Sequence, residues 1–259
     1  EITQRCQAAC PMCDRNINGG KDSPHITNAE LSLEDAKRIF EPDFIKQLKT
    51  FYMCGNLGDP VMAKDTLETF KWLRSINSDL WLSMNTNAGA QEENWWKELA
   101  ETFGRMGTVI FSLDGLADTN HMYRQNVRWE KVERSYKAFI GAGGRARWDY
   151  LIFEHNEHQV EEAKRIAEEV GFERFQAKKT ARFVTTWLDK KEEHQAKNRK
   201  EKDTTTLKKP KNKELQNTAT KQIDSIITKH GSMDNYLDTC NIKCKVAKEG
   251  NIYISAEGL

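Results

Sequence analysis

The sequence lacks any long apolar run and any excess of one charge. No apolar stretch approaches the roughly 18 to 20 residues that a membrane-spanning helix needs. Lys and Arg number 40 against 39 Asp and Glu, so the formal net charge is only +1 over 259 residues. A charge so close to zero gives no overall field that would draw the protein to nucleic acid or to an anionic membrane. We therefore expect neither of these as a partner, and we expect no secretory signal peptide.

Cysteine is scarce, and its placement argues against a disulfide framework. The chain has six cysteines, of which three lie near its start, two near its end and one, Cys54, between them. Such clusters of thiols indicate metal binding in a reducing compartment more than cross-links. We therefore expect a cytoplasmic protein. Its length suits one large α/β domain, or one such domain with a small appendage.

Three of the cysteines, Cys6, Cys10 and Cys13, fall within eight residues. Thiolates are soft ligands that suit iron–sulfur clusters and zinc. Three of them leave one iron of a four-iron cluster without a protein ligand, and an open position is where a metal site does chemistry. A structural zinc knuckle remains the alternative, with Asp14 or His25 as fourth ligand. The spacing favours the cluster because zinc ligands usually come as two C-x2-C pairs.

Short apolar strands alternate with amphipathic helices through residues 1–180. This alternation predicts parallel strands joined by right-handed crossovers. Six strands are too few for an eight-stranded barrel, so the predicted fold is α/β, a partial (β/α)6 TIM-type barrel. The strands are expected at 1–3, 50–54, 80–84, 109–113, 147–153 and 174–177, and the helices at 32 onward, 61–75, 92–103, 129–140 and 157–170.

Polar residues gather just past the predicted strands. In parallel α/β folds the carboxyl ends of the strands carry the active site. The sequence therefore predicts a site at this edge, built from the cysteine loop, the Gly-Asp-Pro loop, Asn85, Asn87, Asp114, Asn156 and Lys178.

The remaining third of the chain has a different composition. Residues 181–239 are rich in Lys, Glu and Thr, which predicts a solvated linker followed by a helix at 221–239. Cys240 and Cys244 then precede a hairpin-like segment at 251–258. We expect residues 240–259 to form a small C-terminal β-hairpin appendage, and the chain to be part of a longer protein.

The spacing C-x3-C-x2-C, with Met12 before the last cysteine, resembles the signature of the radical S-adenosylmethionine (SAM) enzymes. The resemblance implies that Cys6, Cys10 and Cys13 hold a [4Fe–4S] cluster whose fourth iron is chelated by SAM. One electron then cleaves SAM to methionine and a 5′-deoxyadenosyl radical, which takes a hydrogen atom from substrate. In such enzymes the protein positions the reacting atoms and the cofactors supply the chemistry.

Other segments resemble motifs of the same family in the expected order. Residues 55–60 resemble its Gly-Gly-Glu-Pro motif, with Leu57 inserted and Asp in place of Glu. Residues 111–115 and the later Tyr123-Arg124 resemble the pattern of its peptide-modifying branch. Read from the residues alone, several of these positions also suit turns, helix caps or a surface ion pair. The resemblance implies that SAM is bound by Met12, Gly55, Gly58, Asp59, Asn85, Ser112, Arg124 and Asn156.

Cys240 and Cys244 resemble the opening of the auxiliary-cluster domain called SPASM, or of its shorter form, Twitch. Two thiolates are too few to hold a cluster securely, so an auxiliary iron–sulfur cluster and two unligated or disulfide-bonded cysteines both remain open. The resemblance implies a peptide or protein substrate and an electron donor such as flavodoxin or ferredoxin. A small-molecule substrate and a non-catalytic zinc-stabilised binding module are the alternatives, and the catalytic residues stay unassigned.

Overall fold

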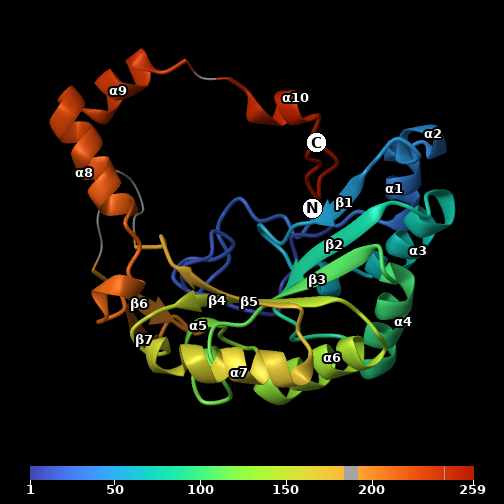
Figure 1. Cartoon of the computed structure of the whole chain (residues 1–259), viewed down its shortest axis with the longest axis horizontal. Helices are drawn as coiled ribbons and strands as arrows, with labels where there is room; N and C mark the ends of the chain where they lie inside the picture. Colours follow the sequence, from blue (N-terminus) through green and yellow to red (C-terminus); the bar gives the residue numbers. More distant parts are fainter. Residues whose placement is uncertain (184–191, 242) are drawn as a thin grey trace.

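The computed structural model describes residues 1–183, 192–241 and 243–259. It is an α/β fold with a five-stranded parallel sheet in the order β1-β2-β3-β4-β5. Figure 1 shows the sheet curving as an open, partial barrel. The strands are β1 (Thr50–Met53), β2 (Trp81–Thr86), β3 (Gly107–Ser112), β4 (Ala146–Ile152) and β5 (Arg174–Lys179).

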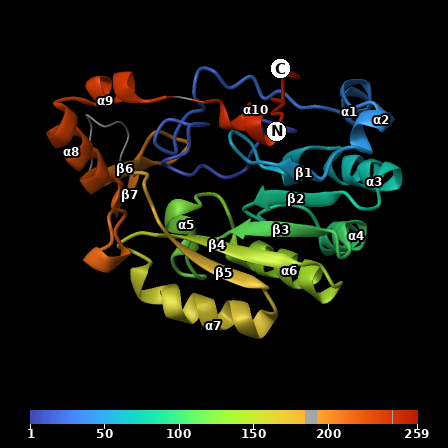
Figure 2. The ribbon, with the colours of Figure 1, turned by 45° about the horizontal axis from the view of Figure 1, so that its top comes forward.

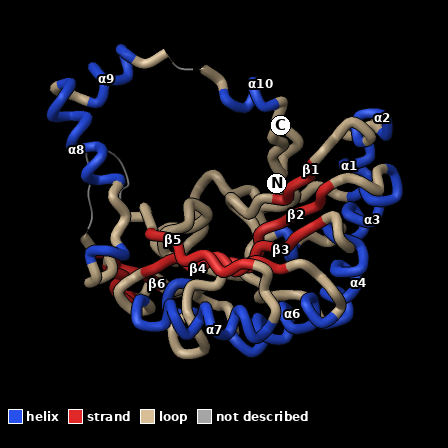
Figure 3. Tube along the Cα trace, in the orientation of Figure 1, coloured by secondary structure: helices blue, strands red, loops and turns tan. Residues whose placement is uncertain are grey.

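Helices follow the strands and cover the outer face of the sheet, as Figures 2 and 3 show. This arrangement confirms the parallel crossover pattern that the sequence predicts. The helices are α1 (Leu33–Ile39), α2 (Pro42–Ile45), α3 (Thr66–Ile76), α4 (Glu93–Phe103), α5 (Asn120–Tyr123), α6 (Trp129–Gly141) and α7 (Val160–Val170), with 3-10 turns η1 (Pro60–Met62) and η2 (Glu157–Gln159).

Helix α4 illustrates why these segments are helical. Its buried residues Trp96, Leu99, Ala100 and Phe103 recur at the spacing of one helical face. That face packs on the sheet, where the Trp96 and Phe111 rings lie 5.6 Å apart. Successive side chains of a strand alternate between its two faces, so the residues next to those that pack on the helices point to the inner, concave face.

The first predicted strand is not part of the sheet. Residues 1–3 make one isolated antiparallel bridge, between Thr3 and Glu30. They are held instead by the cysteine loop, where the Gln4 N–H donates to the Ala29 carbonyl at 2.8 Å. The parallel sheet thus has five strands rather than six, and the chain enters it at β1.

The predicted linker contains structure that its composition does not reveal. Strands β6 (Glu193–Lys197) and β7 (Asp203–Lys208) form an antiparallel hairpin there. Ala196 and Leu207 are fully buried, which anchors the hairpin to the domain. The small hairpin of the fold is therefore this one, since residues 251–258 contain a turn and no strand.

The segment after β7 forms an arm that arches away from the sheet in Figure 1 and returns to the N-terminus. The predicted helix at 221–239 is divided at Gly231, whose φ of +81° ends the first part. At the far end, Gln4 Nε2 donates to Glu257 Oε1 at 2.9 Å. The arm comprises η3 (Lys213–Leu215), α8 (Ala219–His230), α9 (Met233–Thr239) and α10 (Lys245–Glu249). None of the helices that the structure describes is long and apolar enough to cross a membrane.

Candidate active site at the carboxyl edge of the sheet

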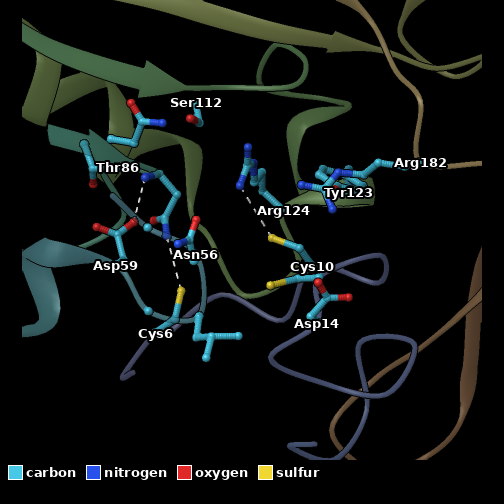
Figure 4. A pocket seen from close by; sticks show the side chains of 16 residues that line it. Cys6, Cys10, Asp14, Asn56, Asp59, Thr86, Ser112, Tyr123, Arg124 and Arg182 are labelled. Carbon is cyan, nitrogen blue, oxygen red and sulfur yellow. Dashed lines mark hydrogen bonds between the residues drawn. The ribbon is translucent and has the colours of Figure 1, made fainter. Parts of the chain in front are cut away.

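A cavity of about 390 Å³ lies where the parallel strands end (Figure 4). It brings together the cysteine loop, the turn after β1, the ends of β2 and β3, and α5. This is the edge at which the sequence places the site. Its walls are formed by Cys6, Cys10, Cys13, Asp14, Gly55, Asn56, Leu57, Gly58, Asp59, Asn85, Thr86, Asn87, Ser112, Tyr123, Arg124 and Arg182.

The three clustered cysteines open onto this cavity as free thiols. Cys10 is buried, whereas Cys6 and Cys13 are half-buried. Two successive turns shape the loop, because the Cys13 N–H donates to the Cys10 carbonyl at 3.1 Å and the Asn16 N–H to the Cys13 carbonyl at 3.1 Å. The backbone therefore fixes where the sulfurs lie before any metal binds.

Two side chains direct N–H groups at cysteine sulfurs. Asn87 Nδ2 lies 3.6 Å from Cys6 Sγ, and a terminal nitrogen of Arg124 lies 3.7 Å from Cys10 Sγ. Figure 4 marks both contacts. Burial raises the pKa of the Cys6 and Cys10 thiols, so both carry a proton until a metal displaces it. Donors of this kind stabilise metal-bound thiolates and tune cluster potentials.

Gly58 and Asp59 form one wall of the cavity. A Cβ at Gly58 would lie 2.0 Å from the Thr3 carbonyl oxygen, so no larger residue fits this turn. Asp59 is buried, and its carboxylate accepts the Asn87 N–H at 2.7 Å and the Val61 N–H at 3.2 Å. Burial raises the pKa of Asp59. A cationic group bound beside it would favour its charged form.

Arg124 occupies the opposite wall and is held by a buried acid. Its Nε donates to Asp114 Oδ2 at 2.7 Å, and the Asp114 side chain is 1% exposed. The other oxygen of Asp114 accepts the Leu151 N–H at 2.6 Å. The guanidinium also lies 5.4 Å from the centre of the Tyr123 ring. Asp114 therefore orients Arg124 and leaves the terminal nitrogens of its guanidinium group facing the cavity.

Residues 1–170 match the family model of the radical SAM superfamily. The chain belongs to the radical SAM superfamily. A comparison with curated proteins returns no match.

Solved radical SAM structures share the fold at low sequence identity. Streptococcus suis SuiB bound to the precursor peptide SuiA matches with a TM-score of 0.54 and 18% identity, over 68% of this chain and 37% of that one. SuiB alone matches with a TM-score of 0.54 and 15% identity, over 98% of this chain and 52% of its own. The structure of anSMEcpe with bound AdoMet, which is SAM, gives a TM-score of 0.53 and 18% identity, over 68% and 49%. The chain thus spans 37% to 52% of their length.

The donor set fits the cluster of a radical SAM enzyme. Three thiols line one cavity, and a four-iron cluster binds one thiolate at each of three irons and leaves the fourth iron open. Of the two expected fourth zinc ligands, Asp14 lines the cavity but exposed His25 lies in a neighbouring groove.

Two predicted SAM contacts do not line the cavity. Asn156 is fully buried, and its amide donates to the carbonyls of Asp114 at 2.8 Å and Leu151 at 2.9 Å. Its Oδ1 accepts the Phe153 N–H at 2.7 Å, so it secures the exit of β4. Met12 packs half-buried against the core and lines the neighbouring groove. The other six, Gly55, Gly58, Asp59, Asn85, Ser112 and Arg124, all line the cavity.

The cavity also has lining residues that were not among the predicted SAM contacts. Asn56, Leu57 and Thr86 flank predicted positions, so their neighbours in sequence are the signal that could have found them. Arg182 follows β5, far along the chain from every motif. Its guanidinium donates to the Met12 carbonyl and lies 6.0 Å from the Tyr123 ring centre. The curvature of the sheet brings it to the cysteine loop.

Cys240 and Cys244 lie in the arm, between α9 and α10, and do not line the cavity. Cys240 is half-buried and Cys244 is exposed, and the two thiols are not joined to each other by a disulfide. An auxiliary cluster at this pair stays a prediction.

Proposed function

We propose that this chain cleaves SAM reductively and acts on a peptide or protein substrate in the reducing cytoplasm. The observation that carries the proposal is the convergence of three free cysteines, Asp59 and Arg124 on one cavity at the carboxyl edge of the sheet. The peptide substrate is supported by the resemblance of residues 111–115 to the peptide-modifying branch. SuiB, of the same fold, is known bound to a precursor peptide.

Cys6, Cys10 and Cys13 would hold the [4Fe–4S] cluster, with Asn87 and Arg124 donating N–H groups to two of the sulfurs. When bound and reduced by a donor such as flavodoxin or ferredoxin, the cluster and SAM supply a 5′-deoxyadenosyl radical that takes hydrogen from substrate.

The chain's own groups suit the two charged ends of an amino acid such as the methionine part of SAM. Asp59 and the backbone of the 55–60 turn offer acceptors for its ammonium group. Arg124, held in place by Asp114, offers a guanidinium for its carboxylate. Asn85 and Ser112 line the same wall, and Asn85 Oδ1 is buried with no hydrogen-bond partner among the described residues. An unpaired buried acceptor indicates a missing donor, which a ligand would supply.

Anaerobic reconstitution tests the proposal. The wild-type protein should retain about four iron and four sulfide ions per chain, the composition of a [4Fe–4S] cluster. Cys10→Ala removes a ligand and should reduce that content at least about fivefold. Cys54→Ala is the matched control, because Cys54 lies outside the cavity lining, and it should match wild type. Equal iron content in the Cys10→Ala and Cys54→Ala proteins would contradict the assignment of Cys6, Cys10 and Cys13 as cluster ligands.

A further inference from the structure

Arg147 on β4 has no partner for its charge. Its side chain is half-buried, and its Nε is buried without a hydrogen-bond partner. Nor does Arg147 make a hydrogen bond or an ion pair anywhere in the part of the chain that the structure describes. Burying part of a charged group without a partner is unfavourable. Such a group indicates that something binds to it.

The strand register places Arg147 beside the candidate active site. Asn85 on β2 pairs with Ile110 on β3, which pairs with Arg147 on β4. In the next inward-facing row, Ser112 on β3 pairs with Asp149 on β4. Paired residues of neighbouring strands point to the same face. Because Asn85 and Ser112 line the cavity, Arg147 and Asp149 lie on the same inward face of the sheet, two strands from Asn85 and one strand from Ser112. That face is opposite α6 and α7 (Figure 1).

The inward-facing residues of β4 and β5 form a strip that carries a net positive charge; its charged members are Arg147, Asp149, Arg174 and Lys178. Arg147 pairs in register with Arg174, and side chains of like charge in such positions repel each other. Lys178 lies four residues after Arg174 on the same face of β5, and its ammonium contacts Asp149 Oδ2. Three cations thus face one carboxylate, and that carboxylate is already paired. A bound anion would relieve the excess charge.

The strip also offers an acceptor. Asp149 Oδ1 is buried with no hydrogen-bond partner in the described ranges. The Asp149 side chain is 14% exposed and sits between the cavity residue Ser112 and β5. A ligand that brings both an anion and an N–H group would satisfy Arg147 and Asp149 together. An amino-acid unit of a peptide with a carboxylate has both.

We propose that Arg147, Asp149 and Lys178 form a carboxylate-binding subsite that selects an acidic residue of the substrate. Arg147 would bind the carboxylate through its guanidinium fork, and Asp149 would accept a peptide N–H. The inference rests on the proposed function, because it names a feature of the peptide that this enzyme acts on. Arg147 is here a specificity-determining residue and has no part in SAM binding.

Three small probes test the subsite and separate two sources of carboxylate. N-acetyl-glutamate amide carries a side-chain carboxylate, N-acetyl-glutamine a terminal one, and N-acetyl-glutamine amide none. Calorimetric titration of the full chain at low salt should show the first binding at least about tenfold more tightly than the third, as expected for a charge-assisted pair. Tighter binding of N-acetyl-glutamine would assign the subsite to a peptide C-terminus, which overturns the selection of an acidic side chain.

Three variants test whether Arg147 is responsible for the preference. Arg147→Gln should abolish the preference for the carboxylate probe, whereas Lys179→Gln should keep it, because exposed Lys179 lies on the opposite face of β5. Arg147→Lys keeps the charge without the fork and should keep a reduced preference. Far-ultraviolet circular dichroism reports whether each variant is folded.

Equal binding of the glutamate and glutamine amides, no binding of either, or a preference that survives in folded Arg147→Gln would overturn the inference. The titration needs neither cluster nor SAM turnover. Failure of this subsite is therefore distinguishable from failure of the proposed function, which loss of SAM cleavage in wild type reports.

Discussion

His155 shows how burial changes the properties of a histidine that follows a strand. Its ring stacks on Phe153 with centroids 5.4 Å apart and planes at 14°. Both ring nitrogens are buried with no hydrogen-bond partner among the described residues. Burial lowers the pKa of His155 from 6.5 to about 4, assisted by His121 and His158 and opposed by Glu154. His155 therefore packs as a neutral aromatic ring.

This pKa predicts a loss of stability in mild acid. Between pH 6.5 and 4 the unfolded chain takes up a proton at His155 that the folded chain resists. The contribution is fully present above pH 6.5 and falls with pH, by up to about 3 kcal/mol. His155→Phe keeps the stacked ring without the titration. Urea unfolding of the metal-free protein should show a smaller loss between these pH values for His155→Phe than for wild type.

Exposed His25 provides the control, because its replacement in His25→Gln should leave the pH profile of wild type unchanged. An identical acid-induced loss in His155→Phe and wild type would contradict the assigned pKa.

Individual site residues were predictable where a short motif fixes the chemistry. Cys6, Cys10 and Cys13 were identified by their spacing, and Gly58 and Asp59 by a local turn. Asn156 was predicted as a SAM contact but lies outside the cavity lining, because a polar residue after a strand looks the same in the sequence whether it faces a ligand or, as here, buried backbone. Arg182 and Arg147 carry no local signal. Their roles depend on which strands become neighbours.

The β6–β7 hairpin packs against the cysteine loop and is hydrogen-bonded to it. The Lys197 N–H donates to the Asn18 carbonyl at 2.7 Å, and Glu201 Oε1 accepts the Lys21 N–H at 2.7 Å. Where the two segments touch, a Cβ at Gly19 would lie 2.6 Å from the Lys197 carbonyl oxygen, and the φ of Gly19 is +90°. Both the space and the backbone conformation therefore require glycine here. The hairpin therefore helps to hold the cysteine loop in place.

Truncating a buried side chain of the hairpin should make the cysteine loop less well held. Leu207→Ala removes a fully buried side chain and should lower the free energy of unfolding by about 2 to 4 kcal/mol. The same variant should lose reconstituted iron faster than wild type during gel filtration. Leu237→Ala, at a position 38% exposed on α9, is the control and should change neither quantity appreciably. Wild-type iron retention in Leu207→Ala would separate the hairpin from the site.

At this scale the sequence predicts regular elements well and irregular pairings poorly. The four longer helices of the domain were anticipated because their apolar residues repeat at helical spacing, as in α4. The hairpin was missed because its strands are polar, with only Ala196 and Leu207 fully buried. The hairpin expected at 251–258 did not form, since those residues have no partner strand within the described chain.

On the scale of the whole molecule, the candidate active site lies on the open side of the partial barrel. The cysteine loop closes one end of the concave face, and the cationic residues of β4 and β5 extend across it. Figure 1 shows the C-terminal arm arching around that side. The sheet therefore carries the three-cysteine cavity and the cationic residues of β4 and β5 on one face, and only the strand register reveals that the two are close.

The most direct test of the central claim is the fate of SAM on the reconstituted, reduced protein. The three-cysteine cavity predicts that 5′-deoxyadenosine and methionine appear together in equal amounts, and that Cys10→Ala forms neither. A protein with a full cluster that leaves SAM intact, or a Cys10→Ala variant that cleaves it as fast as wild type, would contradict the account.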